Sequence, residues 1–132
     1  MSNKIDHIAI AVNDLKKSIE QWKSYFKIKE CYIEEIEERG VKLAQLKIGE
    51  GASIELVTPL GEKSNLSNFL KNKGEGIHHI CFKVQDIDKS VIELKRQGVR
   101  FVSEEPVIGA NGSRIIFIYP DNLNGVLIEL KG

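Results

Sequence analysis

The hydrophobic and polar positions of this chain predict one succession of elements that occurs twice. Residues 5–12 are a β-branched run with strand-like alternation, which places His7 and Ala9 on the same face of the predicted strand. Asn13 or Asp14 then caps a helix whose apolar residues recur at 3.6-residue spacing. Three more strands are expected in this half, at residues 31–36, 41–48 and 52–58.

The second half of the chain predicts the same elements. A strand at residues 77–84 leads to a helix that presents Ile87, Val91 and Leu94 on one side. Three strands should follow, at residues 100–103, 114–119 and 125–130. A connector at residues 62–76, with a short helix at residues 66–72, joins the two halves.

These elements predict an α+β fold in which two tandem βαβββ modules form a single cupped mixed sheet. The 132 residues suit one compact domain, large enough to bury a core. Module one would span residues 1–61, the connector residues 62–76, and module two residues 77–132.

Matched residues indicate that the two modules arose by duplication. His79 follows His7 at the same offset at which Asp86 follows Asp14 (79 − 7 = 86 − 14). The offset from Glu55 to Glu129 is slightly longer (129 − 55), so we expect a small loop insertion in module two.

The matched residues have the chemistry of metal ligands. His7 and His79 head equivalent strands, whereas Glu55 and Glu129 lie in equivalent final strands. If the modules pair about a pseudo-twofold axis, alternation places all four side chains in one concave sheet. Two imidazoles and two carboxylates suit a divalent ion such as Co²⁺, Ni²⁺, Zn²⁺ or Mn²⁺, with positions left open for water or substrate.

Structural interpretations of the same residues compete with this hypothesis. A lone histidine on an apolar strand is usually a satisfied core residue, and Glu129 next to Lys131 could be an edge-strand surface charge. The pairing at matched positions favours the metal site. Gln45 is a hydrogen-bonding candidate if its side of the strand faces the cup, and Arg114 beside a glycine-bearing loop is a candidate contact for an anionic part of a ligand.

Composition excludes several classes of function. Nineteen Lys and Arg balance nineteen Asp and Glu, which argues against a nucleic-acid-binding protein. The longest apolar runs are strand-sized, so we expect no membrane span, and the N-terminus does not lead into a signal-peptide stretch. Cys31 and Cys81 have no CxxC spacing, which favours a reducing, cytoplasmic location.

Four segments resemble the methylmalonyl-CoA epimerase family of the vicinal oxygen chelate superfamily. They lie at residues 6–12, 54–61, 74–80 and 125–130, and together they carry the matched histidines and glutamates. The similarity covers almost the whole chain. Its most family-specific part is Gly-Glu-Gly-Ile-His-His at residues 74–79, because the ligand positions alone are shared with glyoxalase I.

The resemblance implies a metal, commonly cobalt, bound by His7, Glu55, His79 and Glu129. It also implies inversion at the α-carbon of methylmalonyl-CoA, by proton abstraction through a metal-stabilised enediolate. Glu129 is then the favoured base. Some relatives carry a second carboxylate where this chain has Leu43, so Glu55 is the substitute acid or base.

The resemblance also implies partners. The substrate would be a small acyl-CoA, contacted by Gln45, by Arg114 and by Tyr119, which stands where the family often has histidine. A homodimer is expected, without nucleic acid or membrane. Two alternatives stay open: a glyoxalase I (lactoylglutathione lyase)-type isomerase of a hemithioacetal, and a non-catalytic small-molecule-binding protein on the same fold.

Overall fold

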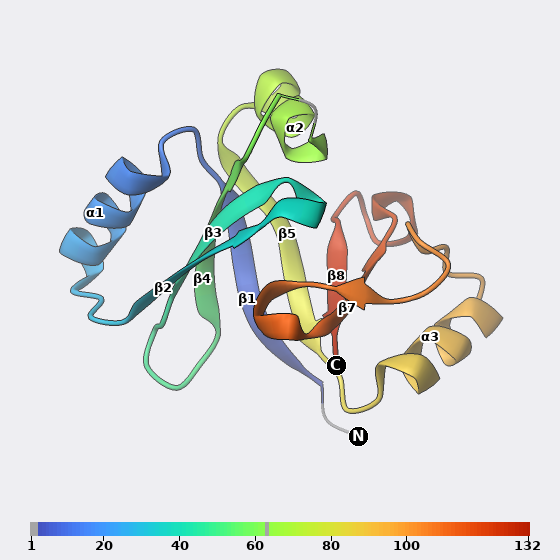
Figure 1. Cartoon of the computed structure of the whole chain (residues 1–132). Helices are drawn as coiled ribbons and strands as arrows, with labels where there is room; N and C mark the ends of the chain where they lie inside the picture. Colours follow the sequence, from blue (N-terminus) through green and yellow to red (C-terminus); the bar gives the residue numbers. More distant parts are fainter. Residues whose placement is uncertain (1–2, 63) are drawn as a thin grey trace. The chain divides into compact units, whose positions relative to one another are not determined.

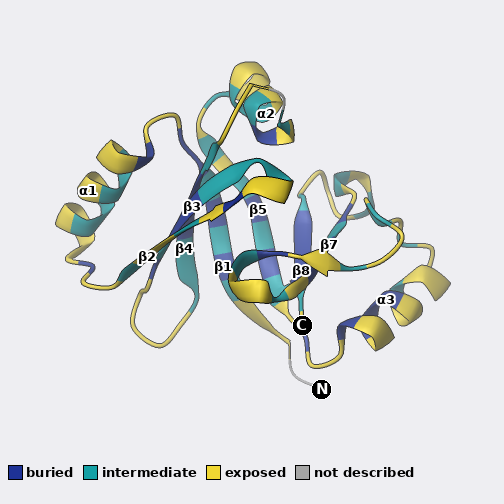
Figure 2. Ribbon diagram, in the orientation of Figure 1, coloured by how far each residue is buried: buried dark blue, intermediate teal, exposed yellow. Residues whose placement is uncertain are grey.

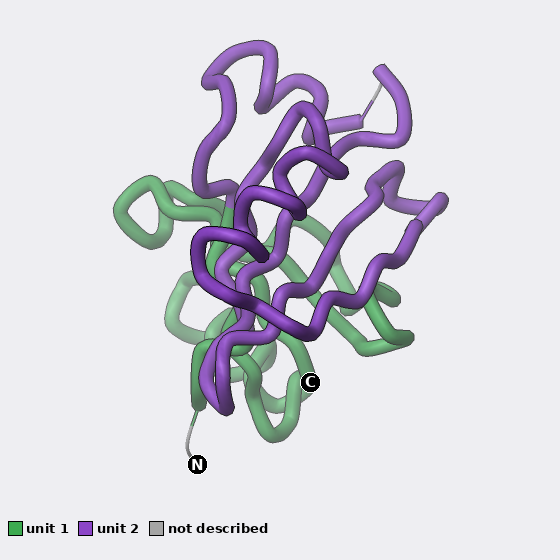
Figure 3. The backbone as a smooth tube through the Cα atoms, turned by 90° about the vertical axis from the view of Figure 1, so that its left-hand side faces the viewer, with its two compact units in different colours: residues 1–6, 79–132 green, residues 7–78 purple. Residues whose placement is uncertain are grey.

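The structure is a computed structural model that describes residues 3–62 and 64–132, and it divides into two compact units (Figure 3). Unit 1 comprises Met1–Asp6 and His79–Gly132, and unit 2 comprises His7–His78. The predicted connector therefore belongs to unit 2. The first strand contributes residues to both units, because the boundary falls between Asp6 and His7.

Unit 2 contains the elements predicted for module one and the connector (Figure 1). In chain order they are β1 (Lys4–Ala11), α1 (Leu15–Phe26), β2 (Cys31–Ile36), β3 (Val41–Leu46), β4 (Ser53–Pro59) and α2 (Asn65–Lys73). The strand order is β2-β3-β4-β1, with β1 parallel to β4 and the other pairs antiparallel.

Helix α1 covers one face of these strands. Asp14 caps it by accepting a hydrogen bond from the Lys17 backbone N–H, and Lys27 ends it in the left-handed conformation. Its buried Leu15 and partly buried Ile19 and Trp22 pack against alternate residues of the strands. The core here comprises Val12, Leu15, Ile28, Ala44, Leu46 and Leu56. By alternation, the neighbouring strand residues face away from α1.

Unit 1 repeats the arrangement. Its elements are β5 (Gly76–Lys83, of which Gly76–His78 belong to unit 2), α3 (Ile87–Arg96), β6 (Val107–Ile108), β7 (Arg114–Ile118) and β8 (Ile128–Lys131), in the strand order β5-β8-β7-β6. Strand β5 runs parallel to β8, and the remaining pairs are antiparallel. Asp86 caps α3 as Asp14 caps α1. The core between α3 and the strands comprises Val84, Ile87, Val91, Ile116, Ile118, Ile128 and Leu130.

Two predicted strands in this unit differ from the structure. Residues 100–103 form only an isolated bridge, between Phe101 and Ile118, and the regular pairing to β7 is made by Val107 and Ile108. Pro106 lies between the two segments, and proline has no N–H to extend a ladder. The last strand begins at Ile128 rather than at Gly125, because the preceding turn holds Gly125 at positive φ.

The remaining elements follow the prediction closely. Figure 2 shows buried residues on the strands that carry each core and exposed residues on the outer sides of the helices. The described helices include none that is both long and apolar enough to cross a bilayer. The predicted α+β class with repeated βαβββ order is confirmed.

Candidate metal centre

In unit 2 a buried histidine and a buried glutamate meet on the face turned away from α1. His7 lies on β1 and Glu55 on the neighbouring β4, where the parallel register pairs Ala9 with Glu55. His7 Nε2 is 3.4 Å from Glu55 Oε2, and each residue is only 4% exposed. Burying a carboxylate is costly unless it is paired, so this contact accounts for the position of Glu55 within the sheet.

Gln45 completes this half of the site. It lies on β3 directly opposite Glu55 in the antiparallel register, and its side-chain Nε2 donates a hydrogen bond to Glu55 Oε2. Leu43, two residues earlier on the same face, is buried and stands opposite Val57. The Glu55 carboxylate is therefore contacted by an imidazole from one neighbouring strand and by an amide from the other.

Unit 1 contains the equivalent pair. His79 lies on β5 and Glu129 on β8, and His79 Nε2 is 3.2 Å from Glu129 Oε1. Both are buried and, by alternation, face away from α3. Phe117 stands opposite Glu129 on β7, and its ring meets the His79 ring edge-on with centroids 5.3 Å apart.

The repeat offset locates the loop insertion. Phe117 follows Gln45 at the offset that also separates the two histidines (117 − 45 = 79 − 7), whereas the offset from Glu55 to Glu129 is longer (129 − 55). The additional residues therefore lie between β7 and β8, in the connection that contains the short 3₁₀ helix Pro120–Asn122. This agrees with the loop insertion expected from the sequence.

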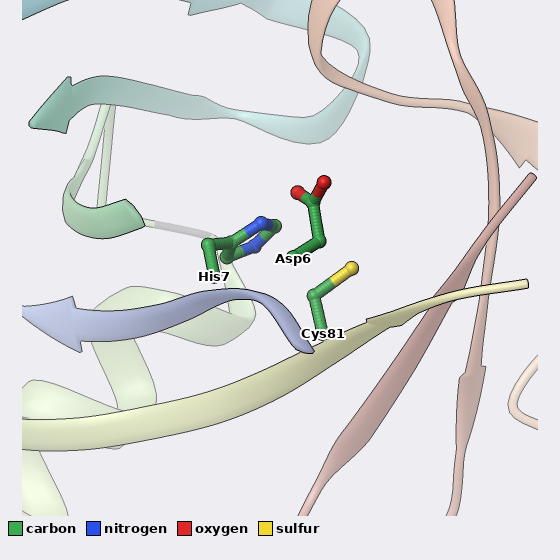
Figure 4. A group of neighbouring side chains, drawn as sticks. All are labelled: Asp6, His7 and Cys81. Atoms are coloured by element: carbon green, nitrogen blue, oxygen red, sulfur yellow. The ribbon is translucent and has the colours of Figure 1, made fainter. Parts of the chain in front are cut away.

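Unit 1 also contains a polar group that the sequence analysis missed. The Asp6 carboxylate lies 3.4 Å from Lys131 Nζ, and it approaches the thiol of the buried Cys81 within 4.8 Å (Figure 4). Cys81 stands opposite Glu129 in the parallel register and shares the face of His79. Nothing in the local sequence identifies Asp6, because its ion-pair partner is at the far end of the chain.

Two predicted ligand-binding residues of unit 1 make contacts with other residues of that unit. Arg114 lies on the α3 face of β7 and binds Asp88 of α3 through two hydrogen bonds of 2.8 and 2.9 Å. These bonds lower the pKa of Asp88 and raise that of Arg114. Tyr119 lies with its ring 5.3 Å from the Arg100 guanidinium and is partly exposed.

His78 has a packing contact rather than a ligand-like one. Its ring meets Phe69 of α2 edge-on, with centroids 4.9 Å apart, and Lys73 lies over the same phenyl ring. Alternation turns His78 to the face opposite that of its neighbour in sequence. Another family-specific residue, Glu75, accepts a hydrogen bond of 2.7 Å from the Asn13 backbone N–H, which ties the connector to the start of α1.

The donor set fits a divalent metal ion. Within each unit one imidazole nitrogen and one carboxylate oxygen lie 3.4 Å (unit 2) or 3.2 Å (unit 1) apart, close enough to bind the same ion. Borderline ions such as Co²⁺, Ni²⁺ and Zn²⁺ accept this combination of nitrogen and oxygen donors. In unit 2 the Gln45 amide supplies the outer hydrogen bond that ligating carboxylates commonly receive.

Comparison with known proteins identifies the family of this chain. A family model for the Glyoxalase/Bleomycin resistance protein/Dioxygenase superfamily matches residues 6–117. The human mitochondrial methylmalonyl-CoA epimerase is 39% identical over 129 residues, which cover 97% of this chain and 73% of that protein. The ethylmalonyl-CoA/methylmalonyl-CoA epimerase of Cereibacter sphaeroides is 38% identical over 133 residues, covering 99% of this chain and 98% of that protein.

A solved structure extends the likeness to three dimensions. A variant of the methylmalonyl-CoA epimerase of Streptomyces coelicolor, in complex with 2-nitronate-propionyl-CoA, has a TM-score of 0.92 and 38% identity. The match covers 97% of this chain and 95% of that one.

The chain belongs to the glyoxalase/bleomycin resistance/dioxygenase superfamily, which confirms the predicted vicinal oxygen chelate fold, and within it to the methylmalonyl-CoA epimerases. This is a family of isomerases, so the predicted enzyme class is confirmed as well.

Proposed function

We propose that this protein inverts the α-carbon of methylmalonyl-CoA in a metal-dependent reaction. The observation that carries the proposal is the repeated buried His–Glu pair, at equivalent strand positions, in a chain similar over nearly its full length to named epimerases. A packing role alone gives no reason for burying two carboxylates in a small domain, because each burial has an energetic cost.

The residues that would hold the metal are His7, Glu55, His79 and Glu129, acting on one ion. Co²⁺ is the favoured ion, with Ni²⁺, Zn²⁺ and Mn²⁺ as alternatives. When bound, the ion supplies Lewis acidity, which stabilises negative charge on substrate oxygens by several kcal/mol. Removal and return of the proton are assigned to side chains of the protein.

The chemical problem is removal of a weakly acidic proton. The α-carbon lies between a thioester and an ionised carboxylate, so carbanion character there needs strong electrostatic stabilisation. In the proposal a Glu129 oxygen accepts the proton, the C–H electron pair forms a C=C bond to the thioester carbon, and the C=O π pair moves onto the thioester oxygen. Glu55 is the candidate acid for the opposite face: it would take up a proton from water, which its carboxylate lacks while it holds the ion, and pass that proton to the carbon. The carbon ends with inverted configuration and unchanged composition.

Three residues are proposed to contact the substrate. Gln45 lies beside Glu55 on the same face, so it can contact a substrate there. Arg114 would have to exchange its contact with Asp88 for a coenzyme A phosphate. Tyr119 is partly exposed and carries a hydroxyl that can donate a hydrogen bond.

We also propose that the protein is a homodimer and that it is cytoplasmic. A homodimer is supported by the short edge strand β6, whose Val107 and Ile108 side chains are exposed. A cytoplasmic location is supported by Cys31 and Cys81, which are both present as thiols. Light scattering on a size-exclusion column tests the dimer directly.

One experiment tests the function. The metal-loaded protein is incubated with methylmalonyl-CoA in deuterated water, and the α-proton signal is followed by NMR. We expect this signal to disappear. Turnover only of a methylglyoxal–thiol adduct would favour the glyoxalase I alternative, and tight binding of acyl-CoA without exchange would favour a non-catalytic binding protein.

A further inference from the structure

The two halves of the candidate site differ at one strand position. In unit 2 the residue opposite Glu55 is Gln45, and in unit 1 the residue opposite Glu129 is Phe117. These two positions are equivalent in the repeat, since both follow the histidine of their module at the same offset (45 − 7 = 117 − 79). Glu55 therefore has an amide side chain opposite it on the adjacent strand, whereas Glu129 has an aromatic ring opposite it.

The difference changes how each glutamate is held. The amide of Gln45 donates a hydrogen bond to Glu55 Oε2, the same oxygen that lies 3.4 Å from His7 Nε2. A phenyl ring has no N–H or O–H donor. Phe117 instead packs edge-on against His79, so in unit 1 the opposite strand orients the imidazole.

We infer that Gln45 is a positioning residue that fixes the Glu55 carboxylate as a metal ligand and thereby makes the two glutamates functionally unequal. The inference rests on the proposed function, because it assumes that Glu55 binds the ion. A carboxylate restrained by an amide from a neighbouring strand keeps one orientation toward the ion. Glu129 has a phenylalanine at the equivalent strand position, so the opposite strand supplies no amide there to hold its carboxylate in the same way.

The strand register places the side chain of Gln45 next to that of Glu55. Gln45 stands directly opposite Glu55, at the separation at which cross-strand side chains interact most strongly. The side chain of Gln45 is half-buried, and Leu43 on the same face is buried and apolar. Little competing water is expected there, which strengthens a hydrogen bond to an ionised group.

The test replaces Gln45 by methionine, which keeps the length of the side chain and removes its donor. Gln21→Met makes the same change on the exposed surface of α1 and serves as the control. Affinity for Co²⁺ is measured by titration without substrate, together with the visible absorption of the bound ion, which reports ligand geometry. We expect Gln45→Met to weaken Co²⁺ binding tenfold to a hundredfold and to alter the spectrum, with Gln21→Met matching wild type.

A reciprocal pair of variants tests the asymmetry. Phe117→Gln introduces a donor opposite Glu129, and Phe117→Leu removes the ring without adding one. By the same reasoning we expect Phe117→Gln to bind Co²⁺ more tightly than Phe117→Leu and to have a lower kcat, and equal affinity and equal kcat in the two variants would overturn the asymmetry. Circular dichroism identifies variants that fail to fold, and the Gln45→Met titration tests the inference without relying on Phe117.

Two results separate failure of this inference from failure of the proposed function. If wild type binds Co²⁺ and exchanges the α-proton while Gln45→Met binds the ion with unchanged affinity and spectrum, the positioning role is overturned and the function stands. If wild type neither binds Co²⁺ nor exchanges the proton, both are overturned.

Discussion

His79 and Glu129 approach each other from adjacent parallel strands, with Nε2 and Oε1 separated by 3.2 Å in the buried part of unit 1. Glu129 is the proposed base, so Glu129→Gln should keep the shape of the side chain and remove its ability to accept the proton. We expect exchange of the α-proton to fall by about 10²–10⁴-fold, the usual contribution of a general base. Proton NMR in deuterated water measures this loss, and wild-type exchange rates in a folded variant would contradict the assignment.

Removal of the metal should inactivate the protein. Dialysis against a chelator is expected to abolish exchange, and addition of Co²⁺ is expected to restore it. Binding to the native state also raises the melting temperature, by an amount that grows with the concentration of free ion. His7→Ala removes one ligand and should lose most of this thermal shift. A chelated protein that retains full activity would exclude a metal-dependent mechanism.

The ring contact between Phe117 and His79 should contribute to stability. Phe117→Leu keeps an apolar side chain and removes the edge-on contact, which is worth about 0.5–1.5 kcal/mol beyond buried area. We expect a loss of about this size in the free energy of unfolding, measured with urea. Phe82→Leu, at a partly buried position packed against the core of unit 1, is the control, and an equal loss there would assign the effect to lost apolar packing.

The ion pair between Asp88 and Arg114 predicts a pH dependence. Its hydrogen bonds lower the pKa of Asp88 in the folded state, so the pair stabilises the fold at pH values above the ordinary pKa of an aspartate. This stabilisation is lost as pH falls through the lowered pKa and the carboxylate is protonated. Asp88→Asn should therefore lower the melting temperature slightly at pH 7 and have no effect in strong acid.

Thermal scans of both proteins between pH 2 and pH 7, an interval of about five units around the usual aspartate pKa, measure this effect. The pair is solvent-exposed, so added salt should reduce the difference between the two proteins. A difference that grows toward acid would have the wrong sign and would contradict the assigned role of Arg114.

The residue pattern was sufficient to predict several features of the fold. Alternation placed His7 with Ala9 and Ala11 on one face, and all three are buried. Spacing predicted α1 and α3, and the aspartate before each helix caps it as expected. These features depend on residues near one another in the chain, where periodicity and capping chemistry act directly.

The pattern did not predict features that depend on which residues of different elements pair with one another. Residues 100–103 have strand-like composition, but only Phe101 forms a bridge. Arg114 is next to a glycine-bearing loop in the sequence, whereas its partner is Asp88, on the helix that packs against its strand. A local pattern contains no information about which side chain of another element lies opposite.

The sequence by itself determined the duplicated order of elements, the matched histidines and glutamates and the family, because these follow from spacing and identity along one chain. Only the tertiary structure decided that Gln45 donates a hydrogen bond to Glu55 and that Phe117 stands opposite Glu129. It also decided that Asp6 forms an ion pair with Lys131. The physical reason is register. Hydrogen-bonded ladders and the lengths of the loops between strands select each cross-strand neighbour, and a shift of one residue would exchange every partner.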